Sequence, residues 1–495
     1  MPSSDIDLVA IPSELKQRSI RGGVAVVAAQ VCKFALQFVS VVVLARLLTP
    51  EDYGLFSIVM AISAFVYIFN DLGLNWATIQ SPEISRGQIS ALFWFNLAFG
   101  CFLALVTAAS SPLIASIYHE PSLMPMTVAM AATYIFSALA GQPKALLRRQ
   151  MKFALIAVIE VATMAAGIIV AIFAAIWGAH YWSLVLMLLT MYGTNALAVW
   201  LAGRWRPGPP SGFSEVKHML NFGGQLTATQ IFNYAVRNLD NLLIGWYWGA
   251  RPLGFYDKAY QMLNVQGLQV STPALGLTLP VLSRLQAEPD RYREYFEKFL
   301  MLAAAAGMSL SAFLFVSADE AVLFILGAQW LPSVPIFRML APAAFLGTSF
   351  ASVHWIFISL GQPARMFRSS VAVTVVTLAG FIIGLPSGAI GVATSFSVTR
   401  TILLLPLFYY ACKKSPLVWT HVLKTILRPA VSACGAVVLI LLLRQVFSLG
   451  QNLFVTLTVL ALLYVLFFLA LWIVLPGGRR SFCEILETIA LLKKK

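Results

Sequence analysis

The chain has 495 residues, of which 59% are hydrophobic and only 11% charged, and its mean hydropathy is +0.82. Soluble proteins carry about 25% charged residues, so this composition excludes a soluble enzyme and indicates a protein that lies in a lipid bilayer. The net charge of +14 is spread over short loops and is not gathered on one polar domain, which indicates membrane topology and no nucleic acid partner.

Long apolar runs dominate the chain. They are some 20 to 27 residues long and mostly uninterrupted, the length of a helix that crosses a hydrocarbon core of ~30 Å. Strands of a membrane barrel would instead alternate over about ten residues. We therefore predict an all-α polytopic membrane protein with about 14 transmembrane helices. In chain order the predicted helices cover 22–48, 54–75, 88–112, 122–143, 153–176, 180–203, 221–248, 254–281, 295–317, 333–359, 366–386, 388–411, 427–446 and 452–475.

The distribution of Lys and Arg predicts the orientation of these helices. With the N-terminus inside, 26 of the 34 basic residues, Lys144 among them, lie in inner loops and tails, three lie in outer loops and five within helices. Because inner loops of membrane proteins are rich in Lys and Arg, we expect both termini to be cytoplasmic. The residues before the first helix are polar and mixed in charge, so no cleavable signal peptide is predicted.

The two halves of the chain repeat each other. Several residues recur about 200 positions later, in the same order and at equivalent places in the topology; Gly54, for example, matches Gly254. The repeated unit holds six predicted helices, an even number, so both copies have the same orientation in the membrane. The expected parts are a cytoplasmic tail at 1–21, a six-helix lobe at 22–203, a cytoplasmic linker at 204–220, a parallel six-helix lobe at 221–412, an appended helix pair at 427–475 and a cytoplasmic tail at 476–495.

Both predicted lobes carry a polar stripe on their first helix. Residues at i, i+3 and i+7 share one helix face, and polar or ionisable groups inside a membrane usually face a cavity or a partner. The stripes, with one further cation in predicted helix twelve, consist of Gln30, Lys33, Gln37, Gln230, Asn233, Arg237 and Arg400. We interpret these residues as the wall of a central cavity suited to a phosphate-bearing or otherwise anionic substrate. The alternative is structural: Arg237 pairs with Asp240, and Lys33 reaches the interface or a backbone carbonyl.

Three acidic residues are candidates for ion coupling or for pairing with the cavity cations. Glu160 lies roughly 10 Å into its predicted helix at 1.5 Å per residue; it suits a proton-coupling carboxylate, the partner of a cavity cation or a simple interhelical bond. Asp71, near the inner end of the second predicted helix, fits either capping or gating. Asp240 lies three residues after the cation of the second stripe.

No motif for soluble chemistry or for a cofactor is found. The five cysteines are scattered, without the spacing of a metal site or a disulfide framework. The chain has no P-loop, so an ATP-driven pump is not supported. We therefore predict no catalytic residue, no metal and no cofactor, and we expect any energy to come from an ion gradient, a substrate gradient or a partner protein.

Sequence blocks spread over nearly the whole chain resemble a known family. Residues 44–54 (LARLLTPEDYG) are similar to the signature that follows the first helix of bacterial polysaccharide transporters, and residues 143–153 (PKALLRRQMKF) resemble the loop after helix four. Further similar blocks are 71–74 (DLGL), 77–80 (ATIQ), 253–259 (LGFYDKA) and 326–330 (LGAQW). The chain thus resembles the polysaccharide transporter family (Wzx-like flippases and exopolysaccharide exporters) of the multidrug/oligosaccharidyl-lipid/polysaccharide (MOP) exporter superfamily.

The resemblance implies a MOP/MATE-like fold and transport, not enzymatic catalysis. The implied cargo is an undecaprenyl-diphosphate-linked oligosaccharide, moved across the bacterial inner membrane by alternating access between the lobes for exopolysaccharide or lipopolysaccharide biosynthesis. The implied partners are this lipid-linked substrate, the bilayer, and polymerase and chain-length or export proteins. The alternatives are a cation-coupled multidrug antiporter, which would favour acidic cavity groups, a flippase for the peptidoglycan lipid precursor, and a membrane scaffold for a polymerase complex.

Overall fold

The computed structural model describes residues 12–70, 78, 84–203, 205–209, 234, 238–266, 272–446, 452–476 and 478–479. All regular secondary structure within these residues is helical. The chain forms two compact units, Met1–Gly254 and Phe255–Lys495, and each unit has its own clusters of buried apolar residues.

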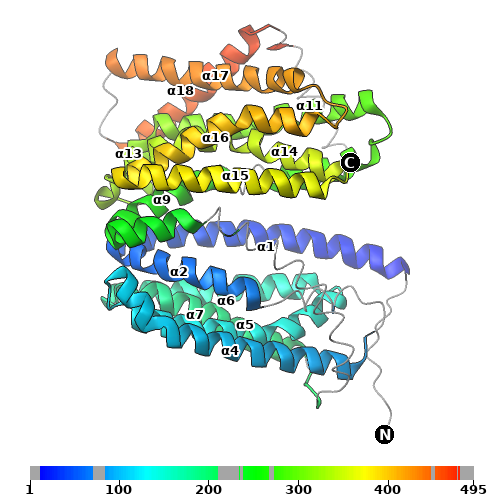
Figure 1. The fold of residues 1–495 in the computed structure, drawn as a ribbon, viewed down its shortest axis with the longest axis vertical. Coiled ribbons are helices and arrows are strands. Elements are labelled where there is room, and N and C mark those ends of the chain that lie inside the picture. Colours follow the sequence, from blue (N-terminus) through cyan, green and yellow to red (C-terminus); the bar gives the residue numbers. More distant parts are fainter. Residues whose placement is uncertain are drawn as a thin grey trace. The chain divides into compact units, whose positions relative to one another are not determined.

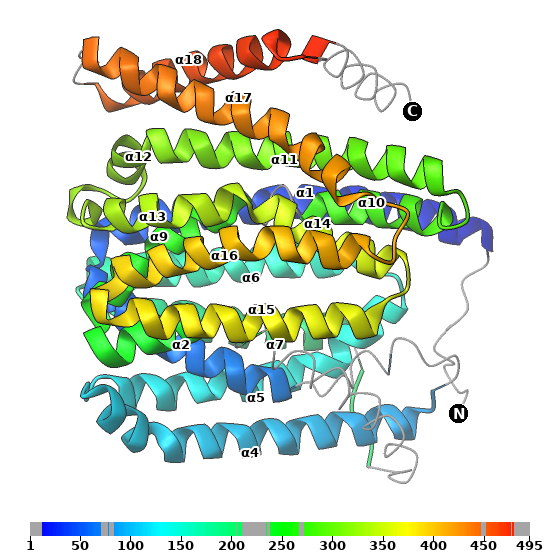
Figure 2. The ribbon, with the colours of Figure 1, turned by 45° about the horizontal axis from the view of Figure 1, so that its top comes forward.

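The first unit is built from long helices, most of which lie side by side (Figure 1; Figure 2). Helices α5, α6 and α7 contact one another, α4 packs on α5, and α1 packs on α6. The bounds are α1 (Pro12–Leu47), α2 (Pro50–Asn70), α4 (Arg86–Tyr118), α5 (Leu123–Arg149), α6 (Phe153–Ile176) and α7 (Trp182–Gly203). Residues 238–248 are helical as well, and α9 (Ala250–Gln266) begins directly after them.

Local signals explain where two of these helices begin. Ser85 and Gln88 form a capping box at the start of α4: the Ser85 hydroxyl accepts the Gln88 N–H at 3.1 Å, and Gln88 Oε1 accepts the Ser85 N–H at 2.7 Å. At the start of α2 the Asp52 carboxylate accepts both the backbone N–H and the hydroxyl of Thr49, at 2.9 and 2.7 Å. These bonds satisfy donors that the first turn of a helix leaves without partners.

Helix α5 continues through Pro143 and ends only at Arg149. Proline has no N–H, so the carbonyl four residues earlier, that of Leu139, loses its helical partner. The indole N–H of Trp200 on α7 donates to this carbonyl at 2.9 Å. Because this bond repairs the helix, α5 extends past its predicted end at residue 143. Lys144, which the sequence analysis assigned to an inner loop, therefore lies on a helix.

Two glycines 200 residues apart allow backbones to touch. A Cβ on Gly54 of α2 would lie 1.7 Å from the carbonyl oxygen of Ala250, and a Cβ on Gly254 would lie 1.8 Å from that of Pro50. The contact is reciprocal, because Pro50 and Ala250 are also 200 residues apart. The repeat seen in the sequence thus places a glycine at both sides of one close crossing between the first turns of α2 and α9.

The second unit continues α9 and adds the remaining helices (Figure 1). Helix α11 packs on α13, α14 and α17, and α16 packs on α13, α14 and α15. The bounds are α10 (Thr272–Arg284), α11 (Pro289–Val316), α12 (Ala318–Ile325), η2 (Ala328–Trp330), α13 (Ser333–Phe345), α14 (Gly347–Ser359), α15 (Pro363–Gly384), η3 (Leu385–Ser387), α16 (Gly388–Cys412), α17 (Trp419–Val446) and α18 (Leu453–Val474).

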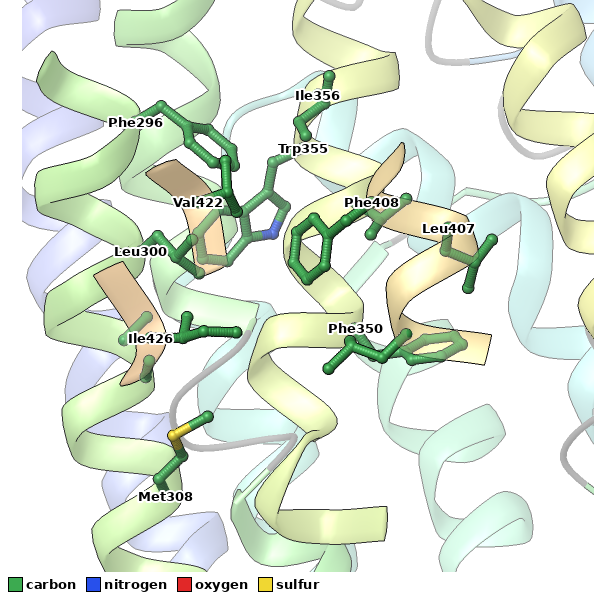
Figure 3. Packing of buried hydrophobic residues seen from close by; sticks show 14 of the residues in the cluster. Phe296, Leu300, Met308, Phe350, Trp355, Ile356, Leu407, Phe408, Val422 and Ile426 are labelled. Atoms are coloured by element: carbon green, nitrogen blue, oxygen red, sulfur yellow. The ribbon is translucent and has the colours of Figure 1, made fainter. Parts of the chain in front are cut away.

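The core of the second unit lies where α11, α14, α16 and α17 meet (Figure 3). Phe296 and Leu300 of α11, Trp355 of α14, Phe408 of α16 and Val422 of α17 are all at most 1% exposed. Burial of large apolar side chains of this kind is worth about 1.5–3 kcal/mol each in water; in a bilayer, close packing takes over the same role.

The last two helices are tied to the rest of the second unit by an ion pair as well as by packing. Arg444 near the end of α17 donates to Glu320 of α12 at 2.9 Å, and both side chains are largely buried. The ring of Tyr464 on α18 packs on Phe313 of α11, with centroids 5.7 Å apart. The helix pair α17–α18 is therefore held by α11 and α12.

The predicted helix 333–359 is long and apolar enough to cross a membrane, but it is not continuous. The helix is interrupted at Leu346, between α13 and α14. Ser397 of α16 contacts the backbone of α13 ahead of this point: its hydroxyl donates to the carbonyl of Met339 at 2.5 Å and accepts the N–H of Ala343 at 3.3 Å. Ser397 therefore binds the carbonyl and the N–H that face each other across one turn of α13, and it ties α16 to this helix.

Eleven described helical stretches are long and apolar enough to cross a membrane, and one of them, Pro363–Cys412, contains both α15 and α16. The predicted helix 221–248 lies mostly outside the described residues. The predicted helix 254–281 falls on α9 and α10, with 267–271 between them outside the described residues. The polytopic all-α class is confirmed, while the number of fourteen helices stays a prediction.

Candidate functional site: buried and half-buried cations

In the first unit, three helices bring two lysines to one carboxylate. Lys33 of α1 places its Nζ 2.9 Å from Oε2 of Glu160 on α6, and Lys144 of α5 places its Nζ 2.8 Å from the other oxygen, Oε1. We call these three residues the Glu160 cluster. Of the roles that the sequence left open for Glu160, the structure shows pairing with a cation, and it replaces the backbone or interface contact considered for Lys33.

The three side chains lie at a common depth. Glu160 is seven residues into α6 from Phe153, and Lys144 is five residues before the end of α5 at Arg149; at 1.5 Å per residue these positions are roughly 8–10 Å from the joined ends of the two helices. Lys33 is 14 residues before the end of α1 at Leu47, or roughly 21 Å from the opposite end. Both measures place the cluster inside helical stretches that are long and apolar enough to cross a membrane, nearer to the end where α5 meets α6.

Lys144 was missed as a site residue because it follows a proline, which is a strong local signal that a helix ends. Proline at position 143 usually ends or kinks a helix, and the bond that repairs this one comes from Trp200, on another helix. The signal that could have found Lys144 is the run Ala145, Leu146 and Leu147 after the proline, because all three are strong helix formers.

The two glutamines of the first stripe lie on α1 with Lys33, as the spacing predicted. Gln30 and Gln37 are exposed in the structure, and neither forms a hydrogen bond to the described side chains of the Glu160 cluster. Their assignment to a substrate cavity stays a prediction.

In the second unit, Arg400 of α16 is held by aromatic rings. Its guanidinium carbon lies 4.3 Å from the ring centroid of Phe350 and 5.0 Å from that of Phe396, distances at which a cation is attracted to the face of a ring. The ring of Tyr260 packs against Phe396, with centroids 6.2 Å apart, and His354 is an electrostatic neighbour of Arg400. The rings thus form a partly apolar surround for the guanidinium.

Arg400 has no acidic counter-ion among the residues that the structure describes. Its Nε is buried without a hydrogen-bond partner there, and no described carboxylate forms an ion pair with it. A guanidinium in this state can still offer its fork of N–H groups to a carboxylate or a phosphate. The two units therefore differ: Lys33 is paired with a carboxylate of the protein, and Arg400 has no such partner among the described residues.

Four of the predicted site residues lie outside the described residues: Gln230, Asn233, Arg237 and Asp71. Asp240 is described; it is buried, and its Oδ1 accepts the backbone N–H of Asn241 at 2.9 Å. Three or more potential metal ligands do not come together anywhere in the described part of the chain.

Comparisons with known proteins identify relatives of this chain. The lipopolysaccharide biosynthesis protein WzxC of Escherichia coli is 25% identical over 395 residues, which cover 78% of this chain and 80% of WzxC. The succinoglycan biosynthesis transport protein ExoT of Rhizobium meliloti is 23% identical over 357 residues, which cover 72% of each chain. Both similarities thus cover more than two thirds of the chain.

A solved structure and a family model also match this chain. The solved structure of the lipid II flippase MurJ in an inward closed conformation matches with a TM-score of 0.73 at 14% identity, over 92% of this chain and 98% of MurJ; at this identity the likeness concerns the fold alone. A family model described as polysaccharide biosynthesis protein matches residues 43–335, more than half of the chain. The chain therefore belongs to the polysaccharide biosynthesis protein family, in agreement with the resemblance of its sequence blocks.

Proposed function

We propose that this protein is a polysaccharide flippase. Its cargo is an oligosaccharide repeat unit linked to undecaprenyl diphosphate, which it moves across the bacterial inner membrane for exopolysaccharide or lipopolysaccharide biosynthesis. Family membership and the relatives named for lipopolysaccharide biosynthesis and succinoglycan transport carry this proposal. Both termini are proposed to be cytoplasmic, and the mechanism is alternating access between two lobes.

The cations inside the helical units support an anionic cargo. Arg400 lies on a membrane-spanning stretch without an acidic partner among the described residues, and an unpaired charge at such a place is costly unless a ligand or water compensates it. A diphosphate carries several oxygens that accept N–H groups in the geometry of a guanidinium fork. The rings of Phe350 and Phe396 are buried and hold the guanidinium in place.

The charges also separate this proposal from a multidrug antiporter. A cavity for cationic drugs would present free carboxylates, whereas Glu160 in the first unit is already bound to two lysines. No observation specifically favours the peptidoglycan precursor as cargo, since the likeness to MurJ concerns the fold.

The proposal is tested with a strain that lacks the gene. Secreted polysaccharide is quantified, and polyprenyl-linked oligosaccharides are extracted and analysed by mass spectrometry. We expect loss of the polymer and accumulation of complete lipid-linked repeat units in the cytoplasmic leaflet, both restored by the wild-type gene. Normal polymer without a trapped intermediate would contradict the proposal for that polymer. Failure to obtain the deletion unless the gene is supplied elsewhere, with trapped peptidoglycan precursor, would assign the other lipid-linked cargo.

A further inference from the structure

The Glu160 cluster has an excess of positive charge. Two ammonium groups converge on one carboxylate, each oxygen of which accepts one of them, so the cluster has a net charge of +1. An interhelical bond that serves only structure needs one cation for one anion, and a second cation in an apolar bundle adds a desolvation cost without a matching partner. Among the described residues no second carboxylate pairs with Lys33 or Lys144.

The cluster is also accessible. The side chains of Lys33, Lys144 and Glu160 are 29%, 25% and 27% exposed, so a solute or a lipid head group reaches them without the helices unfolding. Each lysine has three N–H donors, of which the contact to Glu160 uses one. The ammonium groups therefore have donors left for a second anion.

The placement of the two lysines around Glu160 suits a phosphate. A carboxylate that is bound through both oxygens by two separate ammonium groups occupies the place in which two oxygens of a phosphate would be bound. A diphosphate brings more negative charge than one carboxylate, so exchange would neutralise both lysines. The displaced Glu160 side chain, already partly exposed, would turn toward water.

We propose that Glu160 is an internal counter-ion that occupies a diphosphate-binding site formed by Lys33 and Lys144 until the head group of the cargo displaces it. This inference rests on the proposed function, whose site it extends by Lys144. An internal competitor lowers the apparent affinity by the fraction of time that it occupies the site. A highly charged head group can then be released on the far side of the membrane, because the carboxylate returns to the lysines as the head group leaves.

The Glu160 cluster and Arg400 would bind an anion differently. Arg400 has no acidic partner among the described residues, so no described carboxylate competes with an anion there, whereas the lysines become available only when Glu160 moves. The first unit thus acts as an exchangeable site, and its carboxylate sets how tightly the head group is held.

The experiment measures binding of inorganic pyrophosphate to the purified full-length protein in detergent by isothermal titration calorimetry, at one ionic strength because exposed charges are screened by salt. Glu160→Gln keeps the shape of the side chain and removes the competing charge. We expect its affinity for pyrophosphate to exceed that of the wild type by about tenfold or more, which corresponds to about 1.4 kcal/mol. The double variant Glu160→Gln with Lys144→Ala should lose most of this gain.

The matched control is Glu297→Gln. Glu297 of α11 is 30% exposed and lies 4.0 Å from His421, so it resembles Glu160 in exposure and lies in the other unit; its variant should bind pyrophosphate as the wild type does. If Glu160→Gln does not fold, Glu160→Asp is used, because its shorter side chain cannot bridge both lysines and should give a smaller gain in the same direction. Unchanged or weaker binding by a folded Glu160 variant overturns the inference, as does a gain that survives Lys144→Ala.

Competition distinguishes the source of the phosphate. Polyprenyl diphosphate in the same detergent should displace pyrophosphate, and phosphatidylglycerol, with a single phosphodiester, should not at the same concentration. Equal competition by phosphatidylglycerol would overturn the assignment to a diphosphate. Binding is measured without transport, so the two proposals fail separately: a deletion strain with normal polymer removes the flippase, and unchanged binding by Glu160→Gln removes the exchangeable site.

Discussion

Replacement of Gly54 by alanine tests the close crossing between the first turns of α2 and α9. The new Cβ would lie 1.7 Å from the carbonyl oxygen of Ala250 and 2.4 Å from its carbonyl carbon, where real Cβ atoms keep at least 3.0 Å. The two helices would have to separate by about 1.3 Å, the difference between those distances. Because the obstacle is backbone, no side chain can rotate away to make room.

The cost follows from two opposing contributions. Overpacking of a well-packed contact costs about 1–3 kcal/mol, and a clash with backbone belongs at the upper end. Alanine stabilises a helix interior by about 1 kcal/mol relative to glycine. We therefore expect Gly54→Ala to lower the free energy of unfolding by about 2 kcal/mol, the difference between these two contributions, and Gly254→Ala, whose Cβ meets the carbonyl of Pro50, to behave alike.

The assay is thermal unfolding of the purified protein in detergent, with Gly276→Ala as the control. Gly276 of α10 has no heavy atom within 4 Å of an added Cβ, so its variant should be as stable as the wild type or slightly more stable. If Gly54→Ala unfolds at the same temperature as Gly276→Ala, the close crossing is not a feature of the protein in solution, and the reasoning is refuted.

Three further outcomes are expected. Arg400→Ala should abolish polymer secretion without reducing the amount of folded protein in the membrane, and Arg400→Lys should restore only part of it, because an ammonium keeps the charge but not the planar stacking; wild-type secretion by Arg400→Ala would contradict this role. Arg444→Ala should cost about 1–2 kcal/mol in thermal unfolding, between the values for exposed and buried ion pairs, and adding Glu320→Ala should cost little more; additive losses would show that the two side chains do not interact. Trp200→Phe should cost about 1–3 kcal/mol by leaving the carbonyl below Pro143 without a donor, and Pro143→Ala should recover most of that loss by supplying an N–H; no recovery would mean that the repair is not what the indole provides.

The class of fold was predictable because one physical constraint governs the whole chain. Apolar runs of membrane-spanning length are a property of local composition, and the described helices fall on them. Local composition does not predict where a helix within such a run is interrupted or extended, because these features depend on contacts with other helices. The hydroxyl of Ser397 binds the backbone of α13 from α16, and the extension of α5 past Pro143 depends on the indole of Trp200 on α7; both partners come from other helices.

The candidate site was predictable to a similar degree. Lys33, Glu160 and Arg400 stand out in the sequence because ionisable residues are rare within membrane helices. The partners of these residues do not stand out in the sequence. The sequence gives no reason to choose among the structural and functional roles of Glu160, because its partners depend on which helices pack against α6. Lys144 was hidden by the proline before it, and Phe350 and Phe396 are ordinary apolar residues until Arg400 is placed over their rings.

The central claim, that this protein moves a lipid-linked oligosaccharide across a membrane, is tested most directly in proteoliposomes. The oligosaccharide extracted from the deletion strain is reconstituted with the purified protein, and a glycosidase that cannot cross the membrane is added outside. With the wild-type protein the enzyme should cleave the whole pool of oligosaccharide, because cargo from the inner leaflet keeps reaching the outer leaflet; with Arg400→Ala or without protein, cleavage should stop once the outer leaflet is exhausted. Cleavage by wild-type vesicles that stops at the same outer-leaflet share would contradict the account.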